Sequence, residues 1–251
     1  MSHNFIKIFI LILVIISCTS GKTTEKNNGK QIEVNKLIES EPGIQSFLKP
    51  YKKLVQDSLS QILCYSLKSH SKSEGVLNSA IGNMMADAVF EIASPIYKNT
   101  HNIDIDIVLL NYGGIRASLP KGNIKMENAY EIMPFENKVV VAKMKFEVVQ
   151  KMIKYLISEQ KAHPISGMEI GISKNGDLKK FKIQDQPPNP NRSYFIATSD
   201  YLFNGGDKMN FFKNSDFMYE VNYKVRDMLI DYFKKSDSLK IKSDNRFIYY
   251  N

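Results

Sequence analysis

Apolar residues recur three and four positions apart in several stretches of the chain, a spacing that places them on one face of an α-helix. The longer stretches with this pattern cover residues 44–65, 78–93, 146–158 and 219–235. Pro95 stands just beyond the second stretch, where a helix commonly stops. A shorter helix is predicted at residues 126–132, ahead of Pro134.

Other apolar stretches are short and rich in β-branched and aromatic residues, which predicts strands. They cover residues 103–110, 122–125, 138–145, 168–172, 178–183, 194–198 and 246–250. An Asn-Gly-Asp turn at residues 175–177 predicts a hairpin. Because hairpins and helical crossovers both join the strands, the pattern favours an α+β fold with a mixed β-sheet and packed helices.

Two of the predicted strands run into loops that contain a pair of glycines. The first loop carries Asn111, Gly113, Gly114 and Arg116. The adjacent glycines are expected to turn the backbone with positive φ and to bring bare N–H groups close to a ligand, and the arginine offers a planar fork for phosphate or carboxylate.

The second loop, at residues 199–207, has the same build, with Gly205, Gly206 and Asp207 at its end. Two strands that each end in a glycine pair beside a charged residue predict two loops that line one crevice.

The formal net charge is +8, and it comes mostly from lysine, since the chain has only four arginines: Arg116, Arg192, Arg226 and Arg246. A lysine-rich surface is best explained by codon bias, and the alternative is attraction to an anionic ligand or lipid surface. Basic residues are not interleaved with aromatics, so nucleic-acid binding is not expected.

The N-terminus has the pattern of a targeting segment. Lys7 precedes an apolar run at residues 8–16, too short to span a bilayer but suited to a signal peptide. Ser17 and Cys18 follow, which resembles the lipobox of bacterial lipoproteins. We therefore expect a signal peptide at residues 1–17, lipidation of Cys18, a flexible polar tether at residues 18–38 and one globular domain at residues 39–251.

These features predict an exported bacterial lipoprotein, anchored to a membrane by lipid and facing the periplasm or the cell surface. An ordinary signal peptide with an incidental cysteine is the alternative. The only other cysteine, Cys64, falls in an apolar helical stretch, which indicates a small core residue. A Cys18–Cys64 disulfide is the rival interpretation.

Four landmarks, taken in order, resemble the C-terminal, substrate-recognition domain of the 5′-nucleotidase and UDP-sugar hydrolase family. They are Ile-Gly-Asn-Met-Met-Ala-Asp-Ala at 81–88, Asn-Tyr-Gly-Gly-Ile-Arg at 111–116, Met-Pro-Phe-Glu-Asn at 133–137 and Asp-Tyr-Leu-Phe-Asn-Gly-Gly-Asp at 200–207. Each motif is weak alone. The resemblance covers the whole globular part, including the closing strand with Arg246, and implies that family's fold.

The resemblance also implies roles for individual residues. Phe135 and Tyr201 would sandwich a nucleobase, an arrangement that gains dispersion at little cost in rotamer entropy. Asn111 would contact the nucleoside, Arg116 would lie near the phosphate, and Asp207, next to Gly206, would accept from the ribose hydroxyls. The alternative is that both rings belong to the core and that the aspartate satisfies N–H groups of a turn.

Two differences from the family matter. Lys72 stands in a stretch where relatives often carry an arginine, and it offers a point charge without the bidentate fork. The family's two divalent metal ions are held by an N-terminal metallophosphoesterase domain, whose Asp-x-His and Gly-Asn-His motifs do not occur here. The nearest set of possible ligands, His101, Asp104 and Asp106, is not expected to bind a metal, so no cofactor is predicted in this chain.

The sequence thus predicts the recognition half of a split 5′-nucleotidase-type phosphohydrolase. It would bind a nucleoside or nucleoside 5′-monophosphate, while a separate metallophosphoesterase chain supplies two divalent metal ions. The alternative is a surface lipoprotein that captures nucleosides or nucleotides without hydrolysis. A third and weaker interpretation is a structural lipoprotein whose pocket has decayed.

Overall fold

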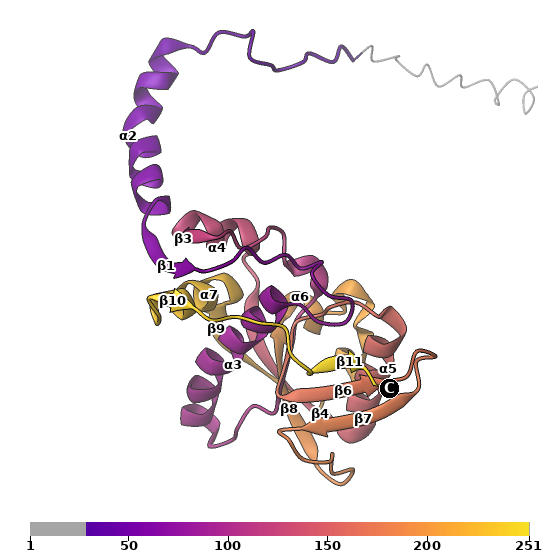
Figure 1. Ribbon diagram of the computed structural model, residues 1–251. Coiled ribbons are helices and arrows are strands. Elements are labelled where there is room, and N and C mark those ends of the chain that lie inside the picture. Colours follow the sequence, from indigo (N-terminus) through magenta and orange to yellow (C-terminus); the bar gives the residue numbers. More distant parts are fainter. Residues whose placement is uncertain (1–28, 251) are drawn as a thin grey trace, which may run out of the picture. The chain divides into compact units, whose positions relative to one another are not determined.

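The computed structural model describes residues 29–250 (Figure 1). The predicted signal peptide and Cys18 lie outside these residues. The chain divides between Leu48 and Lys49 into two units. The first contributes an irregular stretch and the start of α2 (Pro42–Leu59), and the second contains the rest of the described chain. None of the helices in residues 29–250 is long and apolar enough to cross a membrane.

A five-stranded sheet forms the centre of the second unit, in the order β5-β2-β8-β4-β9. Its strands are β5 (Ile165–Ser166), β2 (Ile107–Leu109), β8 (Ser193–Ser199), β4 (Lys138–Lys145) and β9 (Phe217–Lys224). Only β2 and β8 pair in parallel; the other neighbours are antiparallel. The sheet is therefore mixed, and with its helices it confirms the predicted α+β class.

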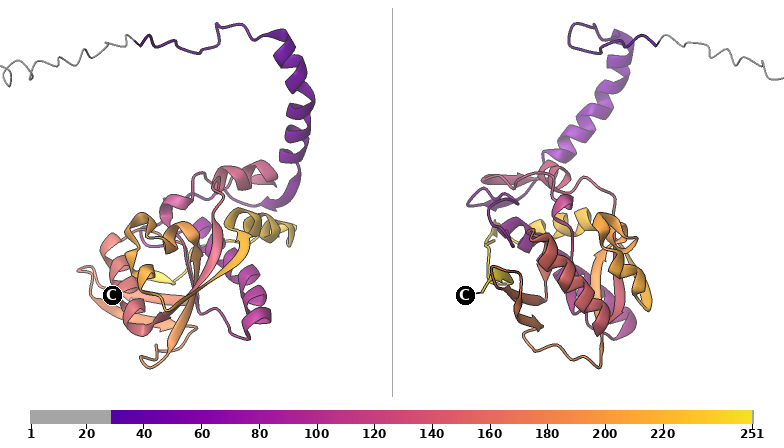
Figure 2. Two further views of the ribbon diagram at one scale, coloured as in Figure 1. Left: turned by 180° about the vertical axis from the view of Figure 1, so that it is seen from behind. Right: turned by 90° about the vertical axis from the view of Figure 1, so that its right-hand side faces the viewer.

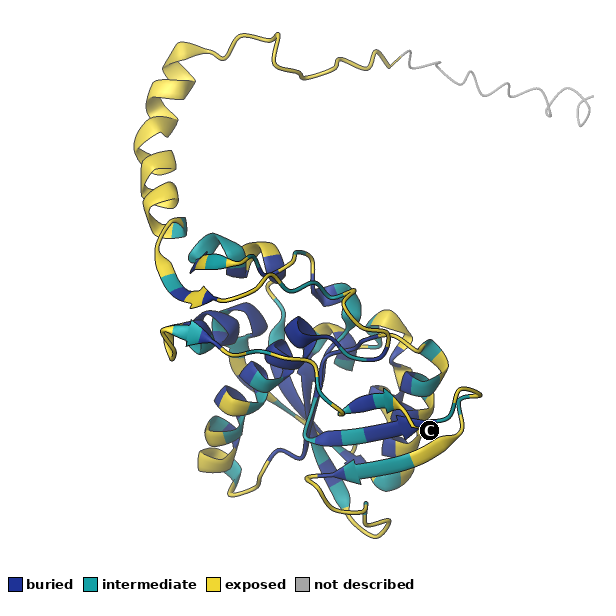
Figure 3. Cartoon of the chain, in the orientation of Figure 1, coloured by how far each residue is buried: buried dark blue, intermediate teal, exposed yellow. Residues whose placement is uncertain are grey.

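Helices cover both faces of this sheet (Figure 2). They include α3 (Ala80–His101) and α7 (Val225–Lys234) on one face and α5 (Phe146–Glu159) on the other. Because successive strand residues face opposite sides, Val108 packs with α3 and α7, whereas Ile107 and Leu109 pack with α5. The central strands are buried on both faces, as Figure 3 shows in dark blue.

Two three-stranded sheets complete the fold. One has the order β10-β1-β3 and the other β11-β6-β7; their strands are β10 (Ser238–Leu239), β1 (Ile62–Ser66), β3 (Gly122–Lys125), β11 (Phe247–Tyr249), β6 (Met168–Ile172) and β7 (Leu178–Ile183). The remaining short helices are α4 (Met126–Ile132), α6 (Asp200–Phe203), η1 (Tyr112–Gly114), η2 (Gly206–Lys208) and η3 (Asn210–Asn214). The predictions for β3, α4, β4, β6 and β7 are confirmed to the residue.

Two predicted helices were too long, because strand pairing overrides helical spacing at one end of each. The helix expected at 44–65 ends at Leu59, and residues 62–66 form β1, which pairs with β3. Cys64 is accordingly a buried strand residue rather than a helical one, and burial raises the pKa of its thiol to about 11. The helix expected at 219–235 begins only at Val225, because the preceding residues form β9 along the edge of β4.

Two other elements differ from their predicted length by more than two residues. Helix α3 continues through Pro95 to His101, beyond the predicted end, and buries Tyr97 against the rings of Phe195 and Tyr219. The residue after the helix, its C-cap Asn102, has a left-handed φ of 54°, a conformation that asparagine tolerates. The strand expected at 103–110 shortens to three residues.

Candidate functional site

The two glycine-pair loops meet because their strands are parallel neighbours. Strands β2 and β8 pair in parallel, so their carboxyl ends lie at the same edge of the sheet. The 111–116 loop follows β2, and the 199–207 loop begins at the last residue of β8. Asn111 Nδ2 donates to Asp207 Oδ2 at 2.6 Å, which joins two loops 96 residues apart in the sequence.

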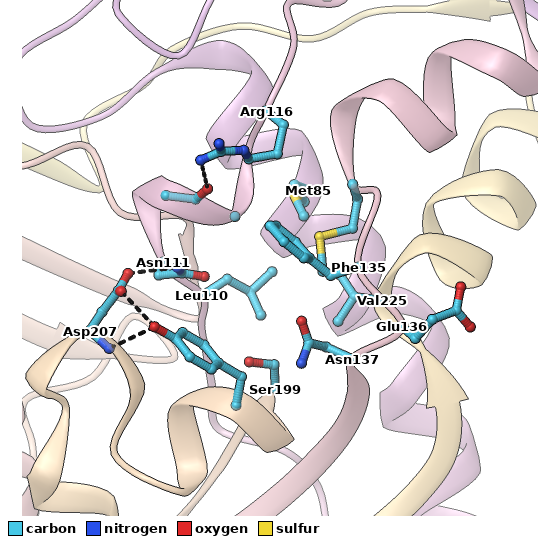
Figure 4. Close-up of a pocket in the computed structure, with 14 residues that line it drawn as sticks. Met85, Leu110, Asn111, Arg116, Phe135, Glu136, Asn137, Ser199, Asp207 and Val225 are labelled. Atoms are coloured by element: carbon cyan, nitrogen blue, oxygen red, sulfur yellow. Dashed lines mark hydrogen bonds between the residues drawn. The ribbon is translucent and has the colours of Figure 1, made fainter. Parts of the chain in front are cut away.

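A cavity of about 570 Å³ opens between these loops and the loop before β4 (Figure 4). Its lining includes every residue predicted to bind the substrate except Gly206, together with residues to which the sequence analysis gave no individual role: Met85, Leu110, Met133, Glu136, Asn137, Ser199 and Val225. In Figure 4, Asn111 and Asp207 lie together at one side and Phe135 at the other. Pockets for small ligands in proteins commonly measure roughly 300–1,000 Å³, so the volume suits a nucleoside-sized molecule.

The first glycine loop does not use positive φ, so that prediction was wrong. Residues 112–114 form the 3₁₀ helix η1, and neither Gly113 nor Gly114 is left-handed. Gly114 is required for space, because a Cβ there would lie 2.8 Å from Asn111 Oδ1. A side chain at this position would push against Asn111 of the Asn111–Asp207 pair. A Cβ on Gly113 would lie 3.5 Å from Asp207 Oδ2, which is an ordinary van der Waals contact.

The second glycine loop does use left-handed backbone. Gly205 has a φ of 93° and Asp207 a φ of 49°. A Cβ on Gly206 would overlap the ring of Tyr201, so glycine at this position allows the ring to lie over the loop. The Tyr201 hydroxyl donates to Asp207 Oδ1 at 3.0 Å and accepts from the Asp207 backbone N–H at 3.3 Å.

Both predicted stacking rings lie outside the core. Phe135 is 42% exposed and Tyr201 is 46% exposed, and both line the cavity. The alternative that they are ordinary core residues is therefore wrong. Aromatic rings left exposed at a cavity wall present flat apolar faces to whatever enters.

Arg226 holds the loop that carries Phe135, a role that the sequence analysis missed. Its buried guanidinium donates to the carbonyls of Pro134 at 3.2 Å and Phe135 at 3.3 Å, and it also pairs with Glu136. The hydrogen bond from Arg226, with a second from Lys224, lowers the pKa of Glu136 to about 2. Arg226 is one of only four arginines, and that rarity was the only sequence signal.

The cationic residues near the first loop contact its backbone. Arg116 donates to the Gly113 carbonyl at 3.4 Å, and its guanidinium carbon lies 6.0 Å from the Phe135 ring centroid. Lys72 Nζ donates to the Ile115 carbonyl at 2.7 Å and lies 4.5 Å from the Tyr112 ring centroid. Lys72 thus lies beside the loop, with its ammonium group bound to a carbonyl oxygen.

The described residues show no arrangement that fits a metal centre. In the part of the chain that the structure describes, no group of three or more His, Cys, Asp or Glu side chains is arranged to hold a metal ion. Of the nearest sequence candidates, Asp106 pairs with Arg192, Asp104 pairs with Lys98, and the His101 ring stacks on Tyr97 at 4.5 Å.

The fold and the order of the motifs are typical of one protein family, and comparison with known proteins identifies it. Residues 64–214 match the family described as "5′-nucleotidase, C-terminal domain", and the chain belongs to it. The apyrase of Tabanus yao is 24% identical over 248 residues, which cover 88% of this chain and 45% of the apyrase. Protein UshA of Escherichia coli is 29% identical over 142 residues, or 54% of this chain and 25% of UshA.

Solved structures agree on the fold. The 5′-nucleotidase precursor of Thermus thermophilus superposes with a TM-score of 0.68 at 21% identity, over 82% of this chain and 43% of that one. The NAD nucleotidase of Haemophilus influenzae gives a TM-score of 0.64 at 16% identity, over 90% of this chain and 47% of that one. The chain thus spans less than half the length of these relatives.

Proposed function

We propose that this chain is the nucleoside- or nucleotide-recognition half of a split 5′-nucleotidase-type phosphohydrolase that acts in nucleotide catabolism. The observation that carries the proposal is a cavity lined by two exposed aromatic rings, Phe135 and Tyr201, and by the carboxylate of Asp207. Membership in the 5′-nucleotidase C-terminal domain family supports it.

The proposed ligand matches the chemistry of the cavity. A nucleobase has two flat faces that stack on aromatic rings, each stack being worth about 1–3 kcal/mol. Asp207 accepts hydrogen bonds from Asn111 and Tyr201. Because a carboxylate has about four lone-pair positions, Asp207 retains acceptor capacity for the two adjacent hydroxyls of a ribose. Arg116 would meet a 5′-phosphate.

Catalysis would come from a separate metallophosphoesterase chain with two divalent metal ions. Phosphoester hydrolysis of this kind needs metals that generate the nucleophile and stabilise the leaving oxygen. The described residues offer no such ligand set. This chain would then bind and orient the nucleotide.

We further propose that the domain at residues 39–251 is an exported lipoprotein held through Cys18 and the 18–38 tether. Its supporting pattern is the apolar run followed by Ser17 and Cys18. Cys18→Ala is expected to release the protein from membranes or to block its maturation. Unchanged partitioning of this variant into detergent would refute the anchor.

Capture of nucleosides or nucleotides without hydrolysis is the second candidate. Lys72 favours it, because this residue has no bidentate fork and its ammonium group already binds the Ile115 carbonyl. One measurement, the rate of hydrolysis after mixing with the metallophosphoesterase, distinguishes the two candidates. A split enzyme turns over when mixed with its metallophosphoesterase, whereas a capture protein binds the same ligands and does not accelerate that enzyme.

Calorimetry with adenosine, AMP and adenine tests recognition. Phe135→Ala or Tyr201→Ala is expected to weaken adenosine binding about tenfold to hundredfold, the effect of losing one stacked ring. Tyr201→Phe keeps the ring and should lose much less. Phe217→Ala is the matched control, because this ring is 46% exposed on β9 and does not line the cavity.

The double variant Phe135→Ala/Tyr201→Ala decides the site assignment. If it binds adenosine as tightly as the unmodified protein while Phe217→Ala behaves the same way, the two rings do not form the base site.

A further inference from the structure

The C-terminal end of α5 and the segment after it reach both ligand-binding loops. The Tyr155 hydroxyl, on the last turns of α5, donates to the backbone carbonyl of Asp207 at 2.7 Å. His163, four residues beyond the helix, accepts at Nδ1 from the backbone N–H of Tyr112 at 3.2 Å. The first bond holds the 199–207 loop, and the second holds the 111–116 loop.

The two side chains also contact each other. Their ring centroids lie 5.8 Å apart, and the Tyr155 ring packs against Phe211 at 5.6 Å. Both residues line a second cavity of about 310 Å³, which shares Gly113 and Asp207 with the candidate nucleoside cavity. Packing on two sides orients the tyrosine hydroxyl before any ligand arrives.

The chemical state of His163 follows from its environment. Its side chain is buried at 3% exposure, and Nδ1 can accept a hydrogen bond only when it carries no proton. The neutral ring must therefore carry its proton on Nε2, which has no hydrogen-bond partner among the described residues. Burial lowers the pKa of His163 to about 4, which keeps Nδ1 available as an acceptor at neutral pH.

The loop that Tyr155 holds contains left-handed backbone. Asp207 has a φ of 49°, a conformation that aspartate adopts more readily than most residues. Among the described residues, the Asp207 carboxylate and N–H form hydrogen bonds with Asn111 and Tyr201, which are themselves loop or cavity residues. The Tyr155 hydroxyl connects the Asp207 carbonyl to the packed helix α5.

We propose that Tyr155 and His163 are positioning residues that fix the two loops relative to each other, so that Asn111 and Asp207 meet the sugar of a nucleoside as a preformed pair. This inference rests on the proposed function, because it assumes a nucleoside in the cavity. Neither residue needs to touch the ligand. A preformed pair saves the free energy of ordering two loops on binding.

Ligand selectivity tests the Tyr155 contact. Tyr155→Phe keeps the ring and removes only the hydroxyl. We expect calorimetry to show adenosine binding weakened about fivefold, the effect of one neutral hydrogen bond, with binding of the free base adenine unchanged. Tyr194→Phe is the matched control, since that hydroxyl also bonds backbone, at Asn189, and lies on β8 outside the cavity lining.

Rescue by a conservative variant tests His163. His163→Asn places an oxygen acceptor where Nδ1 stands, whereas His163→Leu has no acceptor. We expect His163→Leu to weaken adenosine binding and His163→Asn to restore it, with thermal unfolding recorded for each. A general loss of packing would not be repaired by the smaller asparagine side chain.

Hydrogen exchange of the Tyr112 amide provides a readout that needs no ligand. In the free protein we expect faster exchange in His163→Leu and near-normal protection in His163→Asn. If this pattern appears while the unmodified protein binds no adenosine, the proposed function fails and the positioning role stands. Unchanged Tyr112 exchange in His163→Leu, or equal adenosine binding by Tyr155→Phe and the unmodified protein, would overturn the inference.

Discussion

At the scale of single residues, the candidate site depends not only on side chains that face the cavity but also on side chains that form hydrogen bonds to the backbone of its loops. Arg226 binds the carbonyls of Pro134 and Phe135, Tyr155 binds that of Asp207, and His163 binds the N–H of Tyr112. Arg226 and His163 are buried, and loss of any of these three side chains leaves a loop group without its partner.

The pH dependence of stability should carry the signature of His163. Because its pKa in the folded protein is about 4 and an exposed histidine has 6.5, the unfolded chain binds a proton between these values that the folded chain does not. Stability is therefore full above pH 6.5, falls as the pH decreases towards 4, and receives no further loss from this group below that. Chemical denaturation at several pH values measures it.

His163→Asn isolates this contribution. The difference in free energy of unfolding between this variant and the unmodified protein should change from pH 7 to pH 4, in favour of the variant at low pH. The charged groups near the His163 ring are Glu159, Lys161, Asp207 and Lys208, and they are present in both the variant and the unmodified protein. A difference that stays constant over this range would show that His163 does not titrate as described.

At the scale of elements, the C-terminal segment is tied to the helix that carries the first family landmark. Arg246, just before β11, donates to both carboxylate oxygens of Asp87 on α3, at 2.8 and 3.0 Å. It also contacts the Asp244 carboxylate and the Ile165 carbonyl. Helix α3 supplies Met85 to the cavity, so this network supports one wall of the candidate site.

Arg246→Lys should destabilise the fold, because an ammonium group cannot reproduce the planar fork shared by two carboxylates. We expect the free energy of unfolding to fall by about 2 kcal/mol, the scale of hydrogen bonds to charged groups. Lys235→Met is the matched control. This variant loses the half-exposed ion pair between Lys235 and Glu91, which lies on α3 as Asp87 does. Such pairs contribute roughly 0–1 kcal/mol. Equal effects of the two variants in urea unfolding would contradict this account.

At the scale of the whole molecule, we propose that this chain recognises the nucleotide and that a separate chain hydrolyses it. The cavity and its two loops belong to a family domain, and the chain spans less than half the length of its curated relatives. Binding energy at such a site orients the phosphate, but it accelerates hydrolysis only where groups that stabilise the transition state are also present.

We therefore expect the purified chain to release no phosphate from AMP, with or without added Mn²⁺, Mg²⁺ or Zn²⁺. Two metals about 4 Å apart are required for this chemistry, and the described residues hold no matching ligand set. Mixing with the proper metallophosphoesterase should restore turnover, and Phe135→Ala or Tyr201→Ala should then raise KM more than it lowers kcat.

One result would contradict the expectation that the chain alone releases no phosphate. Metal-dependent release of phosphate by this chain alone, retained through purification and abolished by His101→Ala, would reveal a metal site that includes His101.

The pattern of apolar residues predicted the mixed α+β class and most elements of the central sheet, because burial on one face or both imposes a regular spacing. It failed at residues 62–66 and 219–224, where helical spacing and strand pairing conflict. Partner strands β3 and β4 lie far away along the chain, so no local window contains the information that decides between the two.

The sequence by itself determined which motifs are present and that two loops follow buried strands, since turn chemistry and strand length are local properties. Only the tertiary structure decided that β2 and β8 are parallel neighbours, which brings Asn111 to Asp207. It alone also revealed that neither Gly113 nor Gly114 has positive φ, that Gly114 is needed for space, and that Tyr155 and His163 hold both loops. These contacts join segments far apart in the chain. They form only when the helices and sheets have packed together, so no short stretch of sequence determines them.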